Sequence, residues 1–229
     1  MRYLYSKHFF VKKLLFTLVL FILIAFATSM QGQIVIDSLK KELLIEKNDT
    51  SRIVILNQIS RNYFGINPDS LLKYAKTALA ESENINYLFG KFMAYESIGL
   101  YHYGRSEYTD AISSLKIAKK GFKEINKMKE YSNVFLILAA TYTEKAEYQT
   151  AIKHNLQAIE IAKKVFDFLV LSPAYNNIGT IYMKLKDYDL ALKYLNKSLK
   201  LKEKLNDKQH DVYTTSNIAS YILQKKKMI

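Results

Sequence analysis

The chain has 229 residues, 49% of them hydrophobic, which is enough for one domain or a short repeat array. Only 7 Gly and 2 Pro are present, which argues against a turn-rich β-sandwich and favours long helices. The sequence contains no Cys, so disulfides, thiolate metal sites and cysteine nucleophiles are excluded. The net charge of +13 would suit nucleic acid or an anionic membrane, unless part of it serves another purpose.

The first 32 residues have the three-part pattern of a secretory signal peptide. Basic residues without any acid precede an uncharged apolar run from Leu14 to Phe26, and small residues follow at Ala27 and Ser29. We therefore predict that residues 1–32 are a signal peptide and that the protein is exported, to a periplasmic or extracellular location. An uncleaved inner-membrane anchor is the alternative, although this run of 13 residues is shorter than the roughly 20 that span a bilayer. Without residues 1–32, 30 basic and 21 acidic side chains remain, a net charge of +9.

The next segment is predicted to be an N-terminal capping helix within residues 33–50. Residues 36–47 have an amphipathic helical pattern that could cover the first repeat. Asp49, Thr50 and Ser51 then offer cap residues for the helix that follows.

From about residue 51, the same residue types recur every 40 residues. Four positions of the repeat hold the same type of residue in three successive units, and we call each such set a column. Three columns are small: Gly99, Ala139 and Gly179; Ala111, Ala151 and Ala191; Ala118, Ala158 and Ser198. One column is aromatic: Tyr108, Tyr148 and Tyr188. This repetition predicts an array over residues 51–229, with units of about 51–90, 91–130, 131–170 and 171–210 and a half unit at 211–229. A single helix pair cannot bury its apolar face alone, so neighbouring units must stack.

This pattern resembles the tetratricopeptide repeat family over about residues 51–223. The resemblance rests on a large residue, a Gly or Ala, a Tyr, an aromatic turn residue and an Ala, as in Tyr175, Gly179, Tyr182, Tyr188 and Ala191. It implies an all-α fold, a right-handed superhelical solenoid of antiparallel helix pairs. Because the period exceeds the common one of about 34 residues, each helix should be longer than usual. Exported arrays with this period resemble the sensor regions of bacterial membrane signalling proteins.

The sequence shows no arrangement of groups typical of an enzyme. It has no phosphate-binding glycine loop, nucleophile elbow or metal-binding His pair. His102, His154 and His210 occupy unrelated positions in different repeats, and His102 is interpreted as a core or semi-buried replacement for Tyr. We therefore expect no enzyme activity, no cofactor and no metal. The Lys-rich residues 184–229 are interpreted as solvated helix exteriors, because no aromatic residues interleave to stack bases, and we expect no nucleic-acid partner.

In tetratricopeptide proteins, partners commonly bind inward-pointing residues of each first helix. The resemblance therefore implies a protein or peptide partner in a concave groove. Carried over to this sequence, the groove residues are Asn57, Arg61, Phe64, Glu96, Leu100, Tyr103, Leu136, Thr143, Asn176, Thr180 and Met183. Their amide, aromatic and aliphatic groups suit an extended peptide or a helix. The alternative interpretation is an ordinary groove surface without a dedicated ligand.

These observations predict an exported, non-enzymatic protein–protein interaction module. It could be the sensor part of a larger signalling protein, such as a histidine kinase or a transcription regulator. The alternative function is a self-assembling structural or envelope scaffold, joined through the open C-terminal half repeat. Membrane contact is expected only if the N-terminal segment stays uncleaved or the chain is a piece of a longer protein.

Overall fold

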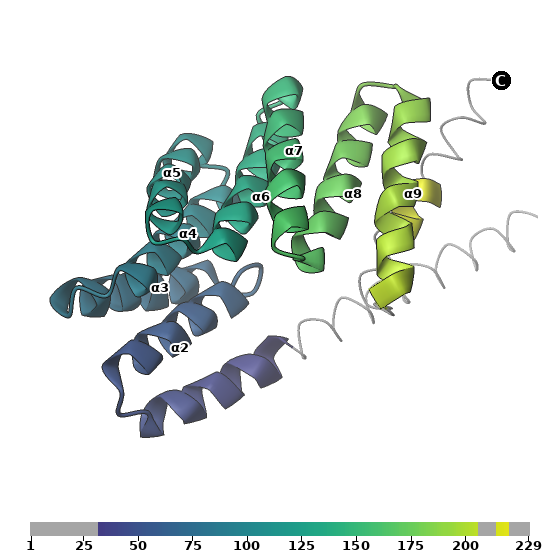
Figure 1. Cartoon of the computed structure of the whole chain (residues 1–229). Helices are drawn as coiled ribbons and strands as arrows, with labels where there is room; N and C mark the ends of the chain where they lie inside the picture. The colour runs from purple at the N-terminus through teal and green to yellow at the C-terminus, as the bar shows by residue number, and fades with distance from the viewer. Residues whose placement is uncertain (1–31, 206–213, 220–229) are drawn as a thin grey trace, which may run out of the picture.

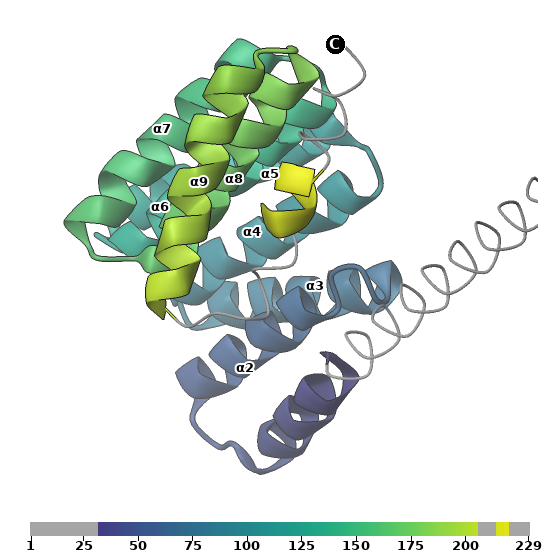
Figure 2. The same ribbon diagram turned by 90° about the vertical axis from the view of Figure 1, so that its right-hand side faces the viewer.

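The computed structural model describes residues 32–205 and 214–219, and all of its regular elements there are α-helices (Figure 1). A first helix covers residues 32–45. The labelled helices that follow are α2 (Asp49–Asn62), α3 (Pro68–Asn84), α4 (Leu88–Gly104), α5 (Tyr108–Glu124), α6 (Met128–Glu144), α7 (Tyr148–Lys164), α8 (Phe168–Lys184) and α9 (Tyr188–Leu205). A short helix at 214–219 lies beside α8 and α9 (Figure 2).

The helices form successive antiparallel pairs that stack side by side. Each helix from α2 to α9 packs on the next, and the first helices also contact one another from pair to pair: α2 with α4, α4 with α6, and α6 with α8. Over the described part of the chain, no such contact joins the second helices α3, α5, α7 and α9. The first helices therefore lie closer together, and the array curves around them, so their exposed side is the inner face.

Six of the turns between helices share one backbone form. Each has three residues, and the middle one adopts a left-handed conformation, as at Asn86, Ser106 and Asn126. The third residue then donates its N–H to a carbonyl of the preceding helix; Glu107, for example, donates to His102 O at 2.9 Å. This bond satisfies one of the carbonyls that a helix end leaves free. The repeat period in the sequence is thus matched by a repeated backbone geometry.

The turn from α2 to α3 departs from this form. This turn spans residues 63–67 because α2 ends early. The repeat as a whole is nevertheless one residue shorter than the others. Gly65 supplies the left-handed conformation here, with φ of 76°. Asn67 caps α3 by accepting the N–H of Ser70, and Pro68 occupies the first helical turn, where its missing N–H costs nothing. This turn shapes the candidate site described below.

One local expectation needs correction. The cap of α2 is Asn48, whose side chain accepts the N–H of Ser51 at 2.9 Å, while Asp49 begins the helix. The helix α8 contains Pro173 in its interior.

The core is a continuous series of apolar layers between pairs. Its small columns sit where helices approach closely: Ala111, Ala118, Ala151 and Ala158 are fully buried. At the N-terminal end, Ile36 is fully buried and packs with Ile55, Ile59, Tyr63 and Leu71. The helix at 32–45 therefore covers the apolar side of the first pair.

The predicted signal peptide lies outside the described residues except for Gly32, and so does most of the predicted half unit. At the C-terminal end, Thr214 is buried and contacts Ser198 and Lys202 of α9. Within residues 32–205 and 214–219, none of the helices has the length and apolar character needed to cross a bilayer.

Candidate functional site

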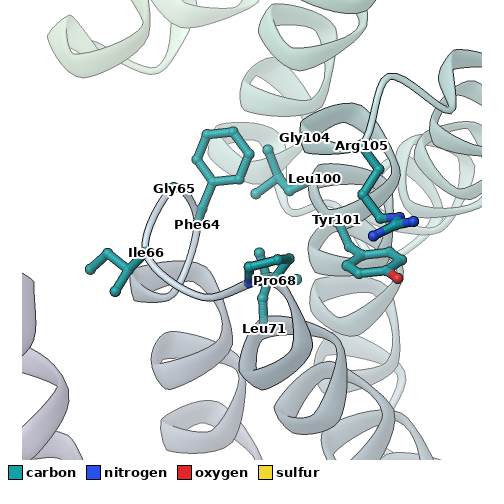
Figure 3. Close-up of a pocket in the computed structure, with 9 residues that line it drawn as sticks. All are labelled: Phe64, Gly65, Ile66, Pro68, Leu71, Leu100, Tyr101, Gly104 and Arg105. Carbon is teal, nitrogen blue, oxygen red and sulfur yellow. The ribbon is translucent and has the colours of Figure 1, made fainter.

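An apolar pocket opens between the α2–α3 turn and the end of α4. Figure 3 shows its lining side chains, which enclose about 640 Å³. Phe64 and Leu100, both predicted groove residues, face it together. The full lining is Phe64, Gly65, Ile66, Pro68, Leu71, Leu100, Tyr101, Gly104 and Arg105.

The pocket exists because of the five-residue α2–α3 turn. Phe64 and Ile66 remain 40% and 37% exposed, although both are large and apolar. Phe64 also lies beside Tyr103, with ring centroids 6.2 Å apart. Burial raises the pKa of the Tyr103 hydroxyl, and the nearby Glu144 and Tyr108 raise it further. Tyr103 therefore stays neutral and can donate a hydrogen bond beside an apolar surface.

A charged cluster crosses the first helices next to this pocket. The Glu96 carboxyl on α4 is fully buried, and its Oε1 accepts a hydrogen bond from Asn133 Nδ2 on α6 at 2.6 Å. Arg61 Nη2 on α2 lies 3.5 Å from the same oxygen, while 39% of the Arg61 side chain remains exposed. Within the part of the chain that the structure describes, Glu96 Oε2 has no hydrogen-bond partner. Arg61 is therefore anchored on its inner side and presents donors outward.

Burial raises the pKa of the Glu96 carboxyl, and the charge of Glu130 adds to this, although Arg61 and Asn133 act in the opposite direction. The pKa of Glu96 is higher in the folded protein than in the unfolded one. The contribution of Glu96 to stability is therefore complete below the ordinary carboxyl pKa of 4.5, where the group is protonated. That stabilisation is lost as the pH rises through the folded pKa.

We expect the variant Glu96→Gln to have a higher free energy of unfolding than the natural chain at neutral pH, by about 1–3 kcal/mol. The amide keeps an acceptor for Asn133 and removes the cost of a buried charge. Near the ordinary carboxyl pKa the two proteins should differ little, which urea unfolding at both pH values would measure. Glu124→Gln, at an exposed position on α5, is the control. A difference that is the same at both pH values would contradict a role for Glu96 ionisation.

The other predicted residues fall into different environments. Asn57 is fully buried and ties α2 to the next pair, since its Nδ2 donates to Ile53 O and Gly90 O, both at 3.1 Å. Asn176 and Thr180 on α8 meet Asn217 of the last described helix, whose Nδ2 lies 3.0 Å from Asn176 Oδ1 and 3.4 Å from Thr180 Oγ1. The structure thus places Asn57 in the framework and pairs the α8 amide with the unit that follows.

Three predicted residues have simpler surroundings. Leu136 is half-buried and packs on the core between the third and fourth pairs. Thr143 donates its hydroxyl to Ala139 O at 2.8 Å, one turn back in its own helix. Met183 is half-buried. None of the three belongs to the pocket or to the Arg61 cluster.

Several residues of the site were not predicted. Asn133 completes the Glu96 cluster, and Gly65, Ile66 and Arg105 help to form the pocket. The shorter first repeat was a usable signal for the pocket, since a change in spacing changes the turn. The Glu96–Asn133 contact joins residues 37 positions apart, and neither one alone suggests it.

His102, Glu107 and Asp110 offer ligand atoms within 4.8 Å of one another. As expected, His102 is semi-buried; its Nδ1 lies 2.7 Å from Glu107 Oε2. The other Glu107 oxygen accepts from Arg105 Nε at 2.9 Å, and this lowers the pKa of Glu107. A metal ion here would be repelled by the Arg105 guanidinium, so the group is best described as an ion-pair cluster at a turn.

Comparison with known proteins agrees with this geometry. Residues 172–205 match the family profile described as tetratricopeptide repeat. The helix pairs have the fold of a tetratricopeptide-repeat solenoid. No curated protein matches the chain.

Solved structures share the fold at low identity. One is a signal-transduction ATPase with a tetratricopeptide repeat sensor from Pyrococcus horikoshii, with TM-score 0.64 and 18% identity over 81% of this chain and 29% of that one. A Rap protein complexed with competence and sporulation factor has TM-score 0.74 and 16% identity over 82% and 53%. The quorum sensor NprR from B. thuringiensis has TM-score 0.62 and 23% identity over 84% and 53%. This chain spans about a third to a half of the length of these relatives.

Proposed function

We propose that this tetratricopeptide-repeat array is a non-enzymatic module that binds a peptide or a segment of a protein on its inner face. The observation that carries the proposal is the apolar pocket beside the outward donors of Arg61. An apolar side chain of the ligand would fill the pocket, while Arg61 and Tyr103 would hydrogen-bond the ligand backbone. The Rap structure supports this use of the fold, since that protein is complexed with competence and sporulation factor.

Export is part of the same proposal. The basic and apolar N-terminal sequence supports a periplasmic or extracellular location, where the array would meet its ligand. A role in signalling, as the sensor part of a larger protein, is supported by the fold shared with a protein that carries a tetratricopeptide repeat sensor.

A displayed library of random peptides tests the binding proposal while the natural ligand is unidentified. We expect the selected peptides to share an apolar residue, and Leu100→Glu to weaken their binding about tenfold or more, because a charge would enter the pocket. Leu156→Glu is the matched control, since Leu156 lies on the second helix α7 and is 46% exposed. Titration calorimetry with one selected peptide measures both. Equal binding by the Leu100→Glu variant and the natural chain would reject the pocket as the site.

A further inference from the structure

The turn between α7 and α8 and the first two residues of α8 expose three large apolar side chains. Phe166 and Leu169 are each 77% exposed and Phe168 is 41% exposed. We refer to Phe166, Phe168 and Leu169 as the apolar tip. It lies at the ends of α7 and α8 away from the α8–α9 turn (Figure 1). Water contact with this much apolar surface is unfavourable, so a cluster of this kind points to a binding surface.

Comparison with the equivalent turns shows that the fold does not require these residues. One repeat earlier, the positions of Phe166 and Leu169 are occupied by Asn126 and Lys129. Phe166 has φ of 55°, close to the 57° of Asn126. Asn tolerates this left-handed conformation, whereas a bulky side chain adopts it only with steric strain. Phe166 is thus both strained and exposed, and the fold alone gives no reason for it.

The surroundings of the apolar tip carry charges of both signs. Lys163 and Lys164 lie at the end of α7, Lys123 at the end of α5 and Lys127 in the neighbouring α5–α6 turn. Asp167 lies within the tip, where its side chain accepts the N–H of Leu169 at 3.1 Å, and Glu124 follows Lys123. Among the described residues, no carboxylate forms an ion pair with Lys163, whereas Lys164 pairs with Glu160 at 2.8 Å. A partner for this region must accept apolar and cationic groups together.

Lysine is in excess on three of the four second helices. Helices α5, α7 and α9 together carry 12 Lys and 5 acidic residues, whereas α3 carries 2 Lys and 3 acidic residues, and the first helices α4, α6 and α8 carry 3 of each. Burial lowers the pKa of the Lys119 ammonium, and the neighbouring Lys116 and Lys123 lower it further. Much of the positive charge that remains after residues 1–32 therefore lies on α5, α7 and α9, where it can attract an anionic surface.

We propose that the α7–α8 turn docks on an anionic lipid bilayer, with the apolar tip inserted among the headgroups and Lys163 and Lys164 bound to lipid phosphates. Aromatic and aliphatic side chains enter the headgroup boundary, while flanking lysines remain in the polar layer. Each lysine near an anionic surface contributes about 1 kcal/mol. This contact is independent of the ligand on the inner face, and it differs from the membrane contact expected for the N-terminal segment.

The chain contains no Trp, so Phe168→Trp provides a single fluorescent reporter in the tip. In the full chain, residues 14–26 could hold the protein on a vesicle by themselves, so a local signal is needed. We expect the indole emission of this variant to shift to shorter wavelength with phosphatidylcholine vesicles that contain phosphatidylglycerol, and the shift to reverse in high salt. Leu156→Trp, on the outer side of α7, is the control reporter and should not shift. No shift of the tip reporter, or an equal shift with phosphatidylcholine alone, would overturn the proposal.

A second set of variants separates insertion from misfolding. Combined with Phe168→Trp, the changes Phe166→Asn and Leu169→Lys restore residues of the α5–α6 turn and relieve the strain at position 166. They should leave thermal unfolding unchanged or raise its midpoint, while weakening vesicle binding about tenfold or more. Lys163→Gln should weaken it about fivefold. Unchanged vesicle binding in the first variant would contradict the proposal. So would an emission shift of the tip reporter that appears without vesicles as protein concentration rises, since the tip would then bind a second copy of the chain.

Discussion

Phe122→Ala is expected to lower the free energy of unfolding by about 3–5 kcal/mol. Phe122 is fully buried on α5, and its ring centroid lies 6.1 Å from those of both Phe89 and Phe92 on α4. The same cluster includes Val134 and Leu138 of α6. The ring therefore fills space between two helix pairs, and its loss leaves a cavity at the interface between repeats.

The position of Phe122 also determines how unfolding should change. In a solenoid, each unit contacts only its neighbours, so a weakened interface reduces the coupling between the two sides. Urea unfolding followed by circular dichroism should show a lower midpoint and a broader transition than the natural chain. Phe64→Ala is the matched control, because Phe64 is 40% exposed and its removal should cost less than about 1 kcal/mol. Equal losses for the two variants would mean that the second and third pairs are not joined through Phe122.

The helix pairs could be predicted from the sequence because their determinants repeat. A small residue in the Gly99 column and another in the Ala111 column allow two helices to approach, and both signals recur at 40-residue intervals. The left-handed turn residues recur too, at Ser106 and Asn126 among others. Local chemistry that occurs several times in one chain can be recognised without any partner residue being known.

The candidate site was less predictable because burial depends on neighbouring repeats. Asn57 and Glu96 occupy inward positions of the first helices, yet both are fully buried, since the next first helix covers them. The pocket depends on the early end of α2 and on Gly65, which occur in one repeat alone among those described. Phe166 was visible in the sequence as a departure from Asn86 and Asn126, but its exposure required the structure.

The column of Gly99, Ala139 and Gly179 also predicts an energetic coupling between residues on the two helices of one pair. A Cβ added at Gly179 would lie 2.8 Å from Leu195 Cγ, and one at Gly99 would lie 2.7 Å from Leu115 Cγ. In the third pair the equivalent residues are Ala139 and Asn155, both fully buried. In this pair the alanine, larger than glycine, faces an asparagine, which is smaller than leucine. Among the described residues, Asn155 Oδ1 has no hydrogen-bond partner. The third pair achieves the same close approach by a different combination.

Exchanging the combinations should produce a strong double-mutant coupling. Asn155→Leu alone brings the leucine against the Ala139 Cβ, and this overpacking should cost about 1–3 kcal/mol. Ala139→Gly alone should cost about 1 kcal/mol through helix propensity, in addition to the space it leaves. Together they recreate the Gly–Leu contact of the second and fourth pairs and remove a buried amide without a full set of partners. We expect a coupling of about 2–3 kcal/mol and a double variant at least as stable as the natural chain.

Urea unfolding of the natural chain, both single variants and the double variant measures this coupling. A parallel change of Ala139→Gly with Asn155→Ala is the control, since it removes the amide but supplies no leucine to fill the space. Additive effects would show that the two residues do not meet across the α6–α7 interface. A favourable coupling would instead mean that repeats resemble one another in pairs of facing residues. The residue size at one position of the repeat would then limit the residue size at the position that faces it.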